Sequence, residues 1–255
     1  MNRNLLVAGA ALVGALGLSA CSYNESLGRN QLLLVNNSSL AASATQAWAQ
    51  TLARSRVSTD PVANARVRTV GSRIIAAAGL NNQPWEYAVF DNNTPNAFAL
   101  PGGKIGVNTG LLRLVANDDQ LAAVIGHEVA HSVANHAAER MSQQAAAQIG
   151  LGVAASALGS QVGADQARQL ASLGSAGAQV GVLLPFSRQH ELEADRLGVE
   201  YMQRAGYDPR QAVLLWETMA RQRTSASTPS ILSTHPSDAN RIAALRQYLA
   251  SRGWG

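Results

Sequence analysis

The sequence predicts an α+β fold, mostly helical, with a small antiparallel sheet. Segments with apolar residues at helical spacing lie on both sides of residues 85–107, and two of them begin at the capping residues Asn117 and Ser187. Residues 85–107 instead contain short alternating runs separated by turn-forming residues. Without its first twenty residues the chain keeps about 235 residues, which is enough for one domain with a substantial core.

The N-terminus resembles the signal of a bacterial lipoprotein. A basic residue precedes an apolar run from Leu5 to Leu18, which is too short for a bilayer that needs ~20 residues. Leu18-Ser19-Ala20-Cys21 resembles a lipoprotein cleavage box, and Ser22 resembles a signal for the outer membrane. We therefore predict a signal peptide at residues 1–20 and lipidation of Cys21. The alternative is an ordinary secretory signal, which would leave Cys21 as a free thiol.

The composition sets limits on the rest of the chain. Cys21 is the only cysteine, so we expect no intramolecular disulfide. Residues 21–39 are polar and rich in Asn and Ser, and we expect them to form the lipid anchor and a tether. Residues 40–255 then form one domain. The net charge is +4, but the arginines are scattered between acidic residues without aromatic interleaving, so we expect no nucleic-acid partner.

Capping residues and apolar periodicity predict the secondary structure in chain order. The expected helices cover residues 40–57, 61–78, 118–148, 188–205, 209–222 and 236–251. The expected strands cover residues 85–90, 97–100 and 104–107. Residues 149–186 are rich in small residues and almost uncharged, which predicts either a packed helical pair or a mobile cover over the functional site. Glycines and polar residues interrupt this segment, so it does not read as a membrane span.

The pentapeptide His127-Glu128-Val129-Ala130-His131 is the most informative stretch of the chain. Two residues four apart on a helix share one face, with their side chains ~6 Å apart, so both imidazoles can reach a single Zn²⁺ ion. Glu128 lies beside them, where it can hold and deprotonate a zinc-activated water. The alternative is a charged helix face that carries two histidines by chance.

A catalytic zinc site needs a third protein ligand. Glu191 and Asp195 are four apart in the helix that Ser187 begins, so they share a face. Glu191 can bind the metal while Asp195 accepts a hydrogen bond from a ligating imidazole. Spacing alone also leaves Glu193 or His190 as the ligand, and a solvated acidic face remains an alternative for the whole segment.

These motifs together resemble a known family. The HEVAH stretch is followed by SRxxExEADxxG from Ser187, and then by Thr234-His235-Pro236, with Arg241 six residues after that histidine. This order resembles the zinc endopeptidase family of the HtpX membrane protease and the CAAX prenyl protease, and most of all its periplasmic lipoprotein branch, the BepA- and LoiP-like proteins. The resemblance covers residues 60–250. It implies a gluzincin-like metalloprotease domain, one Zn²⁺ ion per chain, and Glu191 as third ligand with Asp195 as its partner.

The same resemblance implies that residues 96–103 form the edge strand and turn beside the active site. An extended substrate can add to such an edge as a further strand, so we expect Asn96, Ala97, Phe98 and Ala99 to bind substrate. The alternative is an ordinary hairpin in a small sheet. The resemblance also implies the substrates, which are misfolded or stalled envelope proteins that include outer-membrane barrels.

Two residues near the C-terminus are candidates for catalysis. His235 and Arg241 could stabilise the oxyanion of the tetrahedral intermediate. His235 follows Thr234 in a Ser/Thr/Pro-rich segment, so it could instead swing onto the zinc and close the site as a fourth ligand. A third possibility is that His235 only caps the next helix.

Other histidines and tyrosines are expected to have structural roles. His136 lies nine residues after His127, about 180° around the predicted helix, so we expect it to face away from the metal. His190 is expected at the surface, and Tyr201 and Tyr207 in the packing.

The sequence thus favours a zinc endopeptidase that is lipid-anchored to the outer membrane and faces the periplasm. His127, His131 and Glu191 would hold zinc, and Glu128 would act as the base. The alternative is a non-proteolytic, zinc-stabilised binding module that assembles envelope proteins. An intact Glu128 argues against this alternative, because a pure binder needs no base there.

Overall fold

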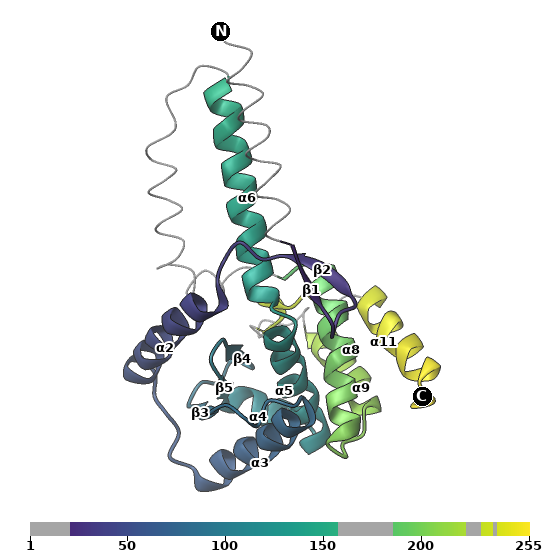
Figure 1. The fold of residues 1–255 in the computed structure, drawn as a ribbon. Helices are drawn as coiled ribbons and strands as arrows, with labels where there is room; N and C mark the ends of the chain where they lie inside the picture. The colour runs from purple at the N-terminus through teal and green to yellow at the C-terminus, as the bar shows by residue number, and fades with distance from the viewer. Residues whose placement is uncertain (1–20, 158–185, 223–230, 237–238) are drawn as a thin grey trace.

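The computed structural model describes residues 21–157, 186–222, 231–236 and 239–255 (Figure 1). The predicted signal peptide, residues 1–20, and most of residues 149–186 lie outside them. The helices are α2 Asn37–Arg54, α3 Pro61–Ala77, α4 Thr109–Leu114, α5 Asp118–Val133, α6 His136–Ala157, α8 Arg188–Arg204, α9 Arg210–Gln222, α10 Ile231–Thr234 and α11 Ala239–Ser251. The strands are β1 Cys21–Asn24, β2 Arg29–Leu32, β3 Glu86–Phe90, β4 Ala97–Leu100 and β5 Lys104–Asn108. The α+β, mostly helical fold is confirmed.

Side-chain caps fix where the main helices begin. The Asn117 side chain accepts a hydrogen bond from the backbone N–H of Gln120, and the Ser187 hydroxyl accepts one from the N–H of His190. Asp60 caps α3 in the same way, with Pro61 in the first turn. These starts agree with the sequence prediction. No helix within the described ranges is long and apolar enough to cross a bilayer.

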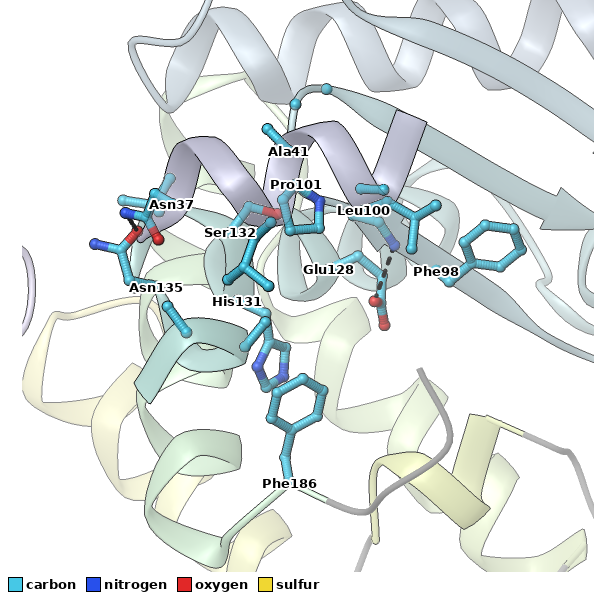
Figure 2. A pocket seen from close by; sticks show the side chains of 18 of the residues that line it. Asn37, Ala41, Phe98, Leu100, Pro101, Glu128, His131, Ser132, Asn135 and Phe186 are labelled. Carbon is cyan, nitrogen blue, oxygen red and sulfur yellow. Dashed lines mark hydrogen bonds between the residues drawn. The ribbon is translucent and has the colours of Figure 1, made fainter. Parts of the chain in front are cut away.

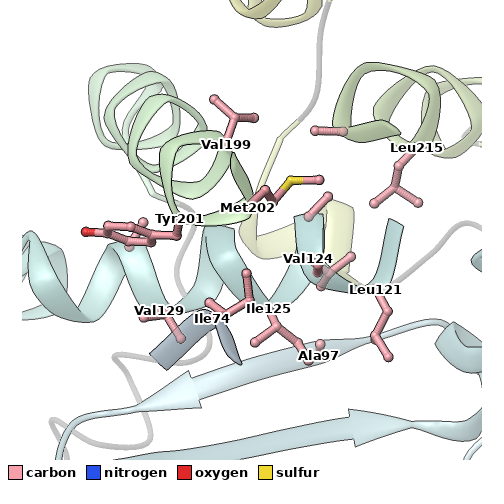
Figure 3. Packing of buried hydrophobic residues seen from close by; sticks show 14 of the residues in the cluster. Ile74, Ala97, Leu121, Val124, Ile125, Val129, Val199, Tyr201, Met202 and Leu215 are labelled. Atoms are coloured by element: carbon pink, nitrogen blue, oxygen red, sulfur yellow. The ribbon is translucent and has the colours of Figure 1, made fainter. Parts of the chain in front are cut away.

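Helix α5 is the centre of the core. In Figure 3 its apolar side chains, among them Leu121 and Ile125, pack between the sheet and helices α8 and α9. Tyr201 is buried in this cluster, as is Tyr207, so the predicted packing roles are confirmed. A helix with apolar residues on several faces is expected where other elements surround it.

Two glycines let α5 and α8 touch backbone to backbone. A Cβ atom added to Gly198 would lie 3.0 Å from the backbone nitrogen of His127, and one added to Gly126 would lie 3.0 Å from the carbonyl oxygen of Gly198. Such distances are tighter than ordinary van der Waals contact, so larger residues would push the helices apart. The close approach places His127 directly against the helix that carries Glu191 and Asp195.

The three-stranded sheet is mixed. Its strand order is β3-β5-β4, with β4 antiparallel and β3 parallel to β5. The prediction of an antiparallel sheet is therefore wrong for one of the two strand pairs. Gly102 and Gly103, both with φ near +80°, close a tight β4–β5 turn, whereas β3 has no such turn to β5. The prediction that residues 97–100 form an edge strand is confirmed.

The single helix predicted for residues 118–148 is wrong. Helix α5 ends at Val133 and α6 starts at His136, because Asn135 has a left-handed backbone with φ 53°. Asparagine tolerates this conformation better than other non-glycine residues. The break changes which side chains of α6 face the histidines of α5.

The N-terminal segment is a folded hairpin rather than a tether over residues 21–32. Strands β1 and β2 pair antiparallel, with Gly28 at φ 68° in the connecting turn. The hairpin lies at the base of α6 beside α8 (Figure 1), and its Arg29 pairs with carboxylates on both helices. Because these ion pairs join residues that lie far apart in the chain, local composition could not reveal the hairpin and predicted a tether instead.

Candidate metal centre and cleft

Four side chains from three segments of the chain converge at one buried point. His127 and His131 come from α5, Glu191 from the first turn of α8, and His235 from the residue after α10. One potential ligand atom from each lies within 4.8 Å of all the others. The capped start of α8 and the glycine contact between α5 and α8 fix the first three positions.

The distances between these atoms fit a zinc ion. The Nε2 atoms of His127 and His131 are 3.1 Å apart, and each lies 3.4 Å from a carboxylate oxygen of Glu191. Zinc bonds of about 2.0–2.1 Å to nitrogen or oxygen in a tetrahedron give ligand separations of about 3.3–3.4 Å. Two imidazole nitrogens and a carboxylate at these separations, away from water, form the donor set that zinc prefers.

Of the third-ligand candidates, Glu191 is the one that the structure brings into this group of described residues. Glu193 points away from the cluster and contacts Arg29 and His136. His190, predicted at the surface, is buried, and its Nε2 lies 3.2 Å from a carboxylate oxygen of Glu139. Burial lowers the pKa of His190 to about 4, so this imidazole is neutral at physiological pH. The surface prediction failed because the hairpin and α6 cover the start of α8.

His127 is supported directly by a carboxylate. Its Nδ1 lies 2.9 Å from Oδ1 of Asp195, which is the contact that the sequence predicted. Arg241 donates to both oxygens of Asp195, at 2.5 and 2.7 Å, and its Nη1 lies 2.6 Å from Glu191. Burial raises the pKa of Asp195, but the charge and hydrogen bonds of Arg241 and the hydrogen bond with His127 together outweigh burial and leave that pKa below its ordinary value. These contacts join Arg241 to both carboxylates of α8, and its role at an oxyanion stays a prediction.

His131 is supported through a second histidine. The Nδ1 atoms of His131 and His136 are 2.9 Å apart, and Nε2 of His136 lies 3.0 Å from Glu193. The prediction that His136 faces away from the metal is wrong, because the break at Asn135 turns α6 back toward the site. Burial lowers the pKa of His136, even though its hydrogen bond to Glu193 favours the charged form.

Glu128 lies on the open side of the cluster. One carboxylate oxygen accepts a hydrogen bond from the Ala99 backbone N–H at 3.3 Å, as the dashed line in Figure 2 shows. The other oxygen is buried without a hydrogen-bond partner among the described residues, 3.4 Å from Nε2 of His235. The base candidate therefore lies between the edge strand β4 and the ligand cluster. This confirms that the edge strand borders the site.

A cleft of about 580 Å³ opens onto Glu128, His131 and His235. Strand β4 and its turn form one wall, and helix α2, the start of α6 and Phe186 form the others (Figure 2). The Phe186 ring packs 4.0 Å from the His131 ring, measured between centroids. The helix at residues 40–57 was predicted, but nothing in the sequence indicated that α2 or Phe186 would line the cleft, because both reach it only through tertiary packing.

The fold and the donor set define a metallopeptidase of the HExxH class. Residues 61–249 match the family described as Peptidase family M48, and the chain belongs to this family.

Several curated relatives support the assignment. The chain is 40% identical to the mitochondrial metalloendopeptidase OMA1 of Schizosaccharomyces pombe, over 72% of this chain and 52% of that protein. It is 33% identical to the beta-barrel assembly-enhancing protease of Escherichia coli K12, over 73% of this chain and 39% of that protein. It is 38% identical to the OMA1 metalloendopeptidase of Danio rerio, over 74% and 41%. The chain spans about half, or less, of the length of these relatives.

Proposed function

We propose that this protein is a zinc-dependent endopeptidase. The observation that carries the proposal is the donor set of His127, His131 and Glu191 at tetrahedral spacing, with the carboxylate of Glu128 beside it and an edge strand next to that carboxylate. Membership of Peptidase family M48 supports the same reading. A binding module would need the metal ligands but not a base on the open side.

The residues of the site divide the chemistry between them. His127, His131 and Glu191 hold the ion, and bound zinc supplies Lewis acidity that activates water and polarises a carbonyl. Glu128 takes the proton from the attacking water and later delivers it to the leaving amine. Its second oxygen, which has no hydrogen-bond partner in the part of the chain that the structure describes, is available to accept that proton.

Strand β4 is suited to present a peptide to Glu128. As the edge of the sheet it leaves backbone groups of residues 96–99 free of a second strand, and an extended substrate can pair with them without specifying side chains. The Ala99 N–H that binds Glu128 ties the position of the strand to that of the base. This arrangement supports cleavage of unfolded polypeptides of varied sequence.

Proteolysis of an unfolded protein such as casein tests the proposal. Wild-type protein should cleave it, Glu128→Gln should lower the rate by about 10²–10⁴-fold, and a chelator should abolish it until zinc is restored. Glu128→Gln should retain zinc and the wild-type circular dichroism spectrum, since it removes no metal ligand. Equal cleavage in all three samples would contradict the enzyme and favour the binding module.

We further propose that His235 closes the resting site as a fourth ligand. Its Nδ1 lies 3.2 Å from Nε2 of His127 and 3.0 Å from Glu191, which is the spacing of the other ligand atoms. A zinc site with four protein ligands is closed, so substrate would have to displace the imidazole. His235→Ala should then raise basal cleavage, with Thr234→Ala as the control beside it. A role in oxyanion stabilisation predicts the opposite, a loss of kcat by tenfold or more.

The cellular setting is the envelope in our proposal. The lipoprotein-like sequence that ends at Cys21 and the similarity to a beta-barrel assembly-enhancing protease support an anchor in the outer membrane and misassembled envelope proteins as substrates. The similarity to mitochondrial OMA1 supports only the protease class.

Cys21→Ala should release the protein from membranes or stall its processing, whereas Ser22→Ala, which keeps the cysteine, should fractionate as the wild type. A processed Cys21→Ala protein that stays on membranes would contradict the anchor.

A further inference from the structure

A continuous chain of contacts joins the N-terminal hairpin to one metal-ligand candidate. Arg29 of β2 binds Glu193 of α8, Glu193 binds His136 of α6, and His136 contacts His131 of α5. The sequence predicted none of it, because residues 21–39 were expected to form a tether.

Arg29 holds two carboxylates at once. Its Nε and Nη2 donate to the two oxygens of Glu193 at 2.6 and 2.8 Å, and its Nη1 and Nη2 donate to the two oxygens of Glu139 at 2.7 and 2.9 Å. This two-sided fork uses the planar geometry that arginine has and lysine lacks. Gln31, also in β2, donates to Glu139 at 2.6 Å and to the carbonyl of Ala134 at 2.7 Å, at the break between α5 and α6.

The proton positions along this chain follow from the metal site. If Nε2 of His131 faces a metal ion, its Nδ1 must carry the hydrogen and donate it to Nδ1 of His136. The hydrogen of neutral His136 is then on Nε2, from which it is donated to the Glu193 carboxylate 3.0 Å away. Only a charged Glu193 accepts this bond fully, and Arg29 stabilises that charge. Each donor thus has one acceptor, and the arrangement fixes both tautomers.

We propose that Arg29, Glu193 and His136 are positioning residues of the metal centre, so that the β1–β2 hairpin is part of the zinc site. The proposal rests on the zinc site of the proposed function. The three residues act through His131, by fixing the direction and tautomer of its ring. Detachment of the hairpin would leave Glu193 without its cation and free His136 to turn, and zinc would then bind more weakly.

The competing role is a structural staple that holds the hairpin to the domain without affecting the metal. Ion pairs of this kind are often replaceable without loss of function. The two roles differ in one measurable quantity, the zinc affinity of the folded protein. A staple changes the free energy of unfolding and leaves that affinity unchanged, whereas a positioning chain changes both.

The experiment titrates metal-free protein with zinc in competition with a chromophoric chelator, without any substrate. Glu193→Gln, which keeps the side-chain volume, and Arg29→Gln should each weaken zinc binding by about 10–100-fold. Arg29→Lys should recover part of this loss, because it restores the charge but not the fork. The visible spectrum of the cobalt-substituted protein should change in the same variants, since it reports the geometry of the ligands.

Arg196→Gln is the matched control. Arg196 also binds the hairpin, through a hydrogen bond to the carbonyl of Ser26 at 3.2 Å, but among the described residues no hydrogen bond or ion pair joins it to Glu193 or His136. Its zinc affinity and cobalt spectrum should equal those of the wild type. If Arg29→Gln does not fold, Glu193→Gln decides the question by itself, because its change of one charge leaves the packing in place.

Zinc affinities within twofold of wild type in Glu193→Gln would overturn the proposal and leave the hairpin as a staple. The result is independent of proteolysis. A wild-type protein that binds zinc but cleaves nothing would contradict the proposed function and leave the positioning role of Arg29, Glu193 and His136 unaffected.

Discussion

The two histidines of the HEVAH helix differ in what holds them. His127 contacts a carboxylate directly, and both that carboxylate, Asp195 of α8, and its partner, Arg241 of α11, are buried. The Nδ1 atom of His131 instead reaches a carboxylate through His136, and the last cation of this chain of contacts, Arg29, has a side chain that is 22% exposed in a peripheral hairpin. The support of His127 is therefore part of the core, whereas the support of His131 depends on a hairpin that can be altered without changing the core.

The two histidines therefore depend on different parts of the fold. The His127 side is fixed as soon as α5 and α8 pack, because Gly126 and Gly198 bring their backbones into contact. The His131 side is complete only when the N-terminal hairpin has docked. If Cys21 is lipidated, the hairpin is also the segment closest to the membrane, so attachment and metal binding would involve the same hairpin.

The largest expected effect separates the two glutamates of the α8 helix. Glu191→Ala should lose zinc completely on dialysis, because it removes a ligand that lies 3.4 Å from both imidazole nitrogens. Glu193→Ala should retain most of its zinc under the same conditions, since Glu193 is not a ligand and acts on His131 only through His136. Metal analysis of both purified variants checks this. Zinc retained without Glu191 and lost without Glu193 would exchange their roles.

The next effect tests the buried side. Arg241→Leu leaves Asp195 and Glu191 as buried carboxylates without their cation, which should lower the free energy of unfolding by about 3–5 kcal/mol. Urea unfolding of the metal-free protein measures this loss. The control is Arg246→Leu on the same helix, whose ion pair with Glu217 is on the surface and should contribute about 0–1 kcal/mol. Similar losses in the two variants would show that burial does not distinguish them.

Much of the metal centre could be predicted because its signals are local. His127 and His131 are four residues apart in one helix, and Glu191 and Asp195 are four apart in another. Each pair therefore shares a helix face. The contact between the two helices was not derivable from spacing, and it entered only through the resemblance to a family.

One physical origin of the failed predictions is interaction across long sequence separations. Arg29 and Glu193 are 164 residues apart, so neither the hairpin nor its ion pairs leave a trace in local composition. His136 was misplaced for a different reason, since periodicity assumes an unbroken helix and a single left-handed residue changes the phase. Asn135 was the one available signal, and asparagine inside a predicted helix is too common to be decisive.

The smallest effect concerns that left-handed residue. Asn135→Ala should destabilise the protein by about 1–2 kcal/mol, because alanine disfavours φ 53°, whereas Asn135→Gly should be better tolerated. Both variants also lose the hydrogen bond that the Asn37 amide donates to Asn135 at 3.0 Å. Asn37→Ala removes that bond alone and serves as the control, with all four proteins compared by urea unfolding. If Asn135→Ala is no less stable than Asn37→Ala, the left-handed break is not strained by a Cβ atom. The placement of His136 beside His131 would then need another explanation.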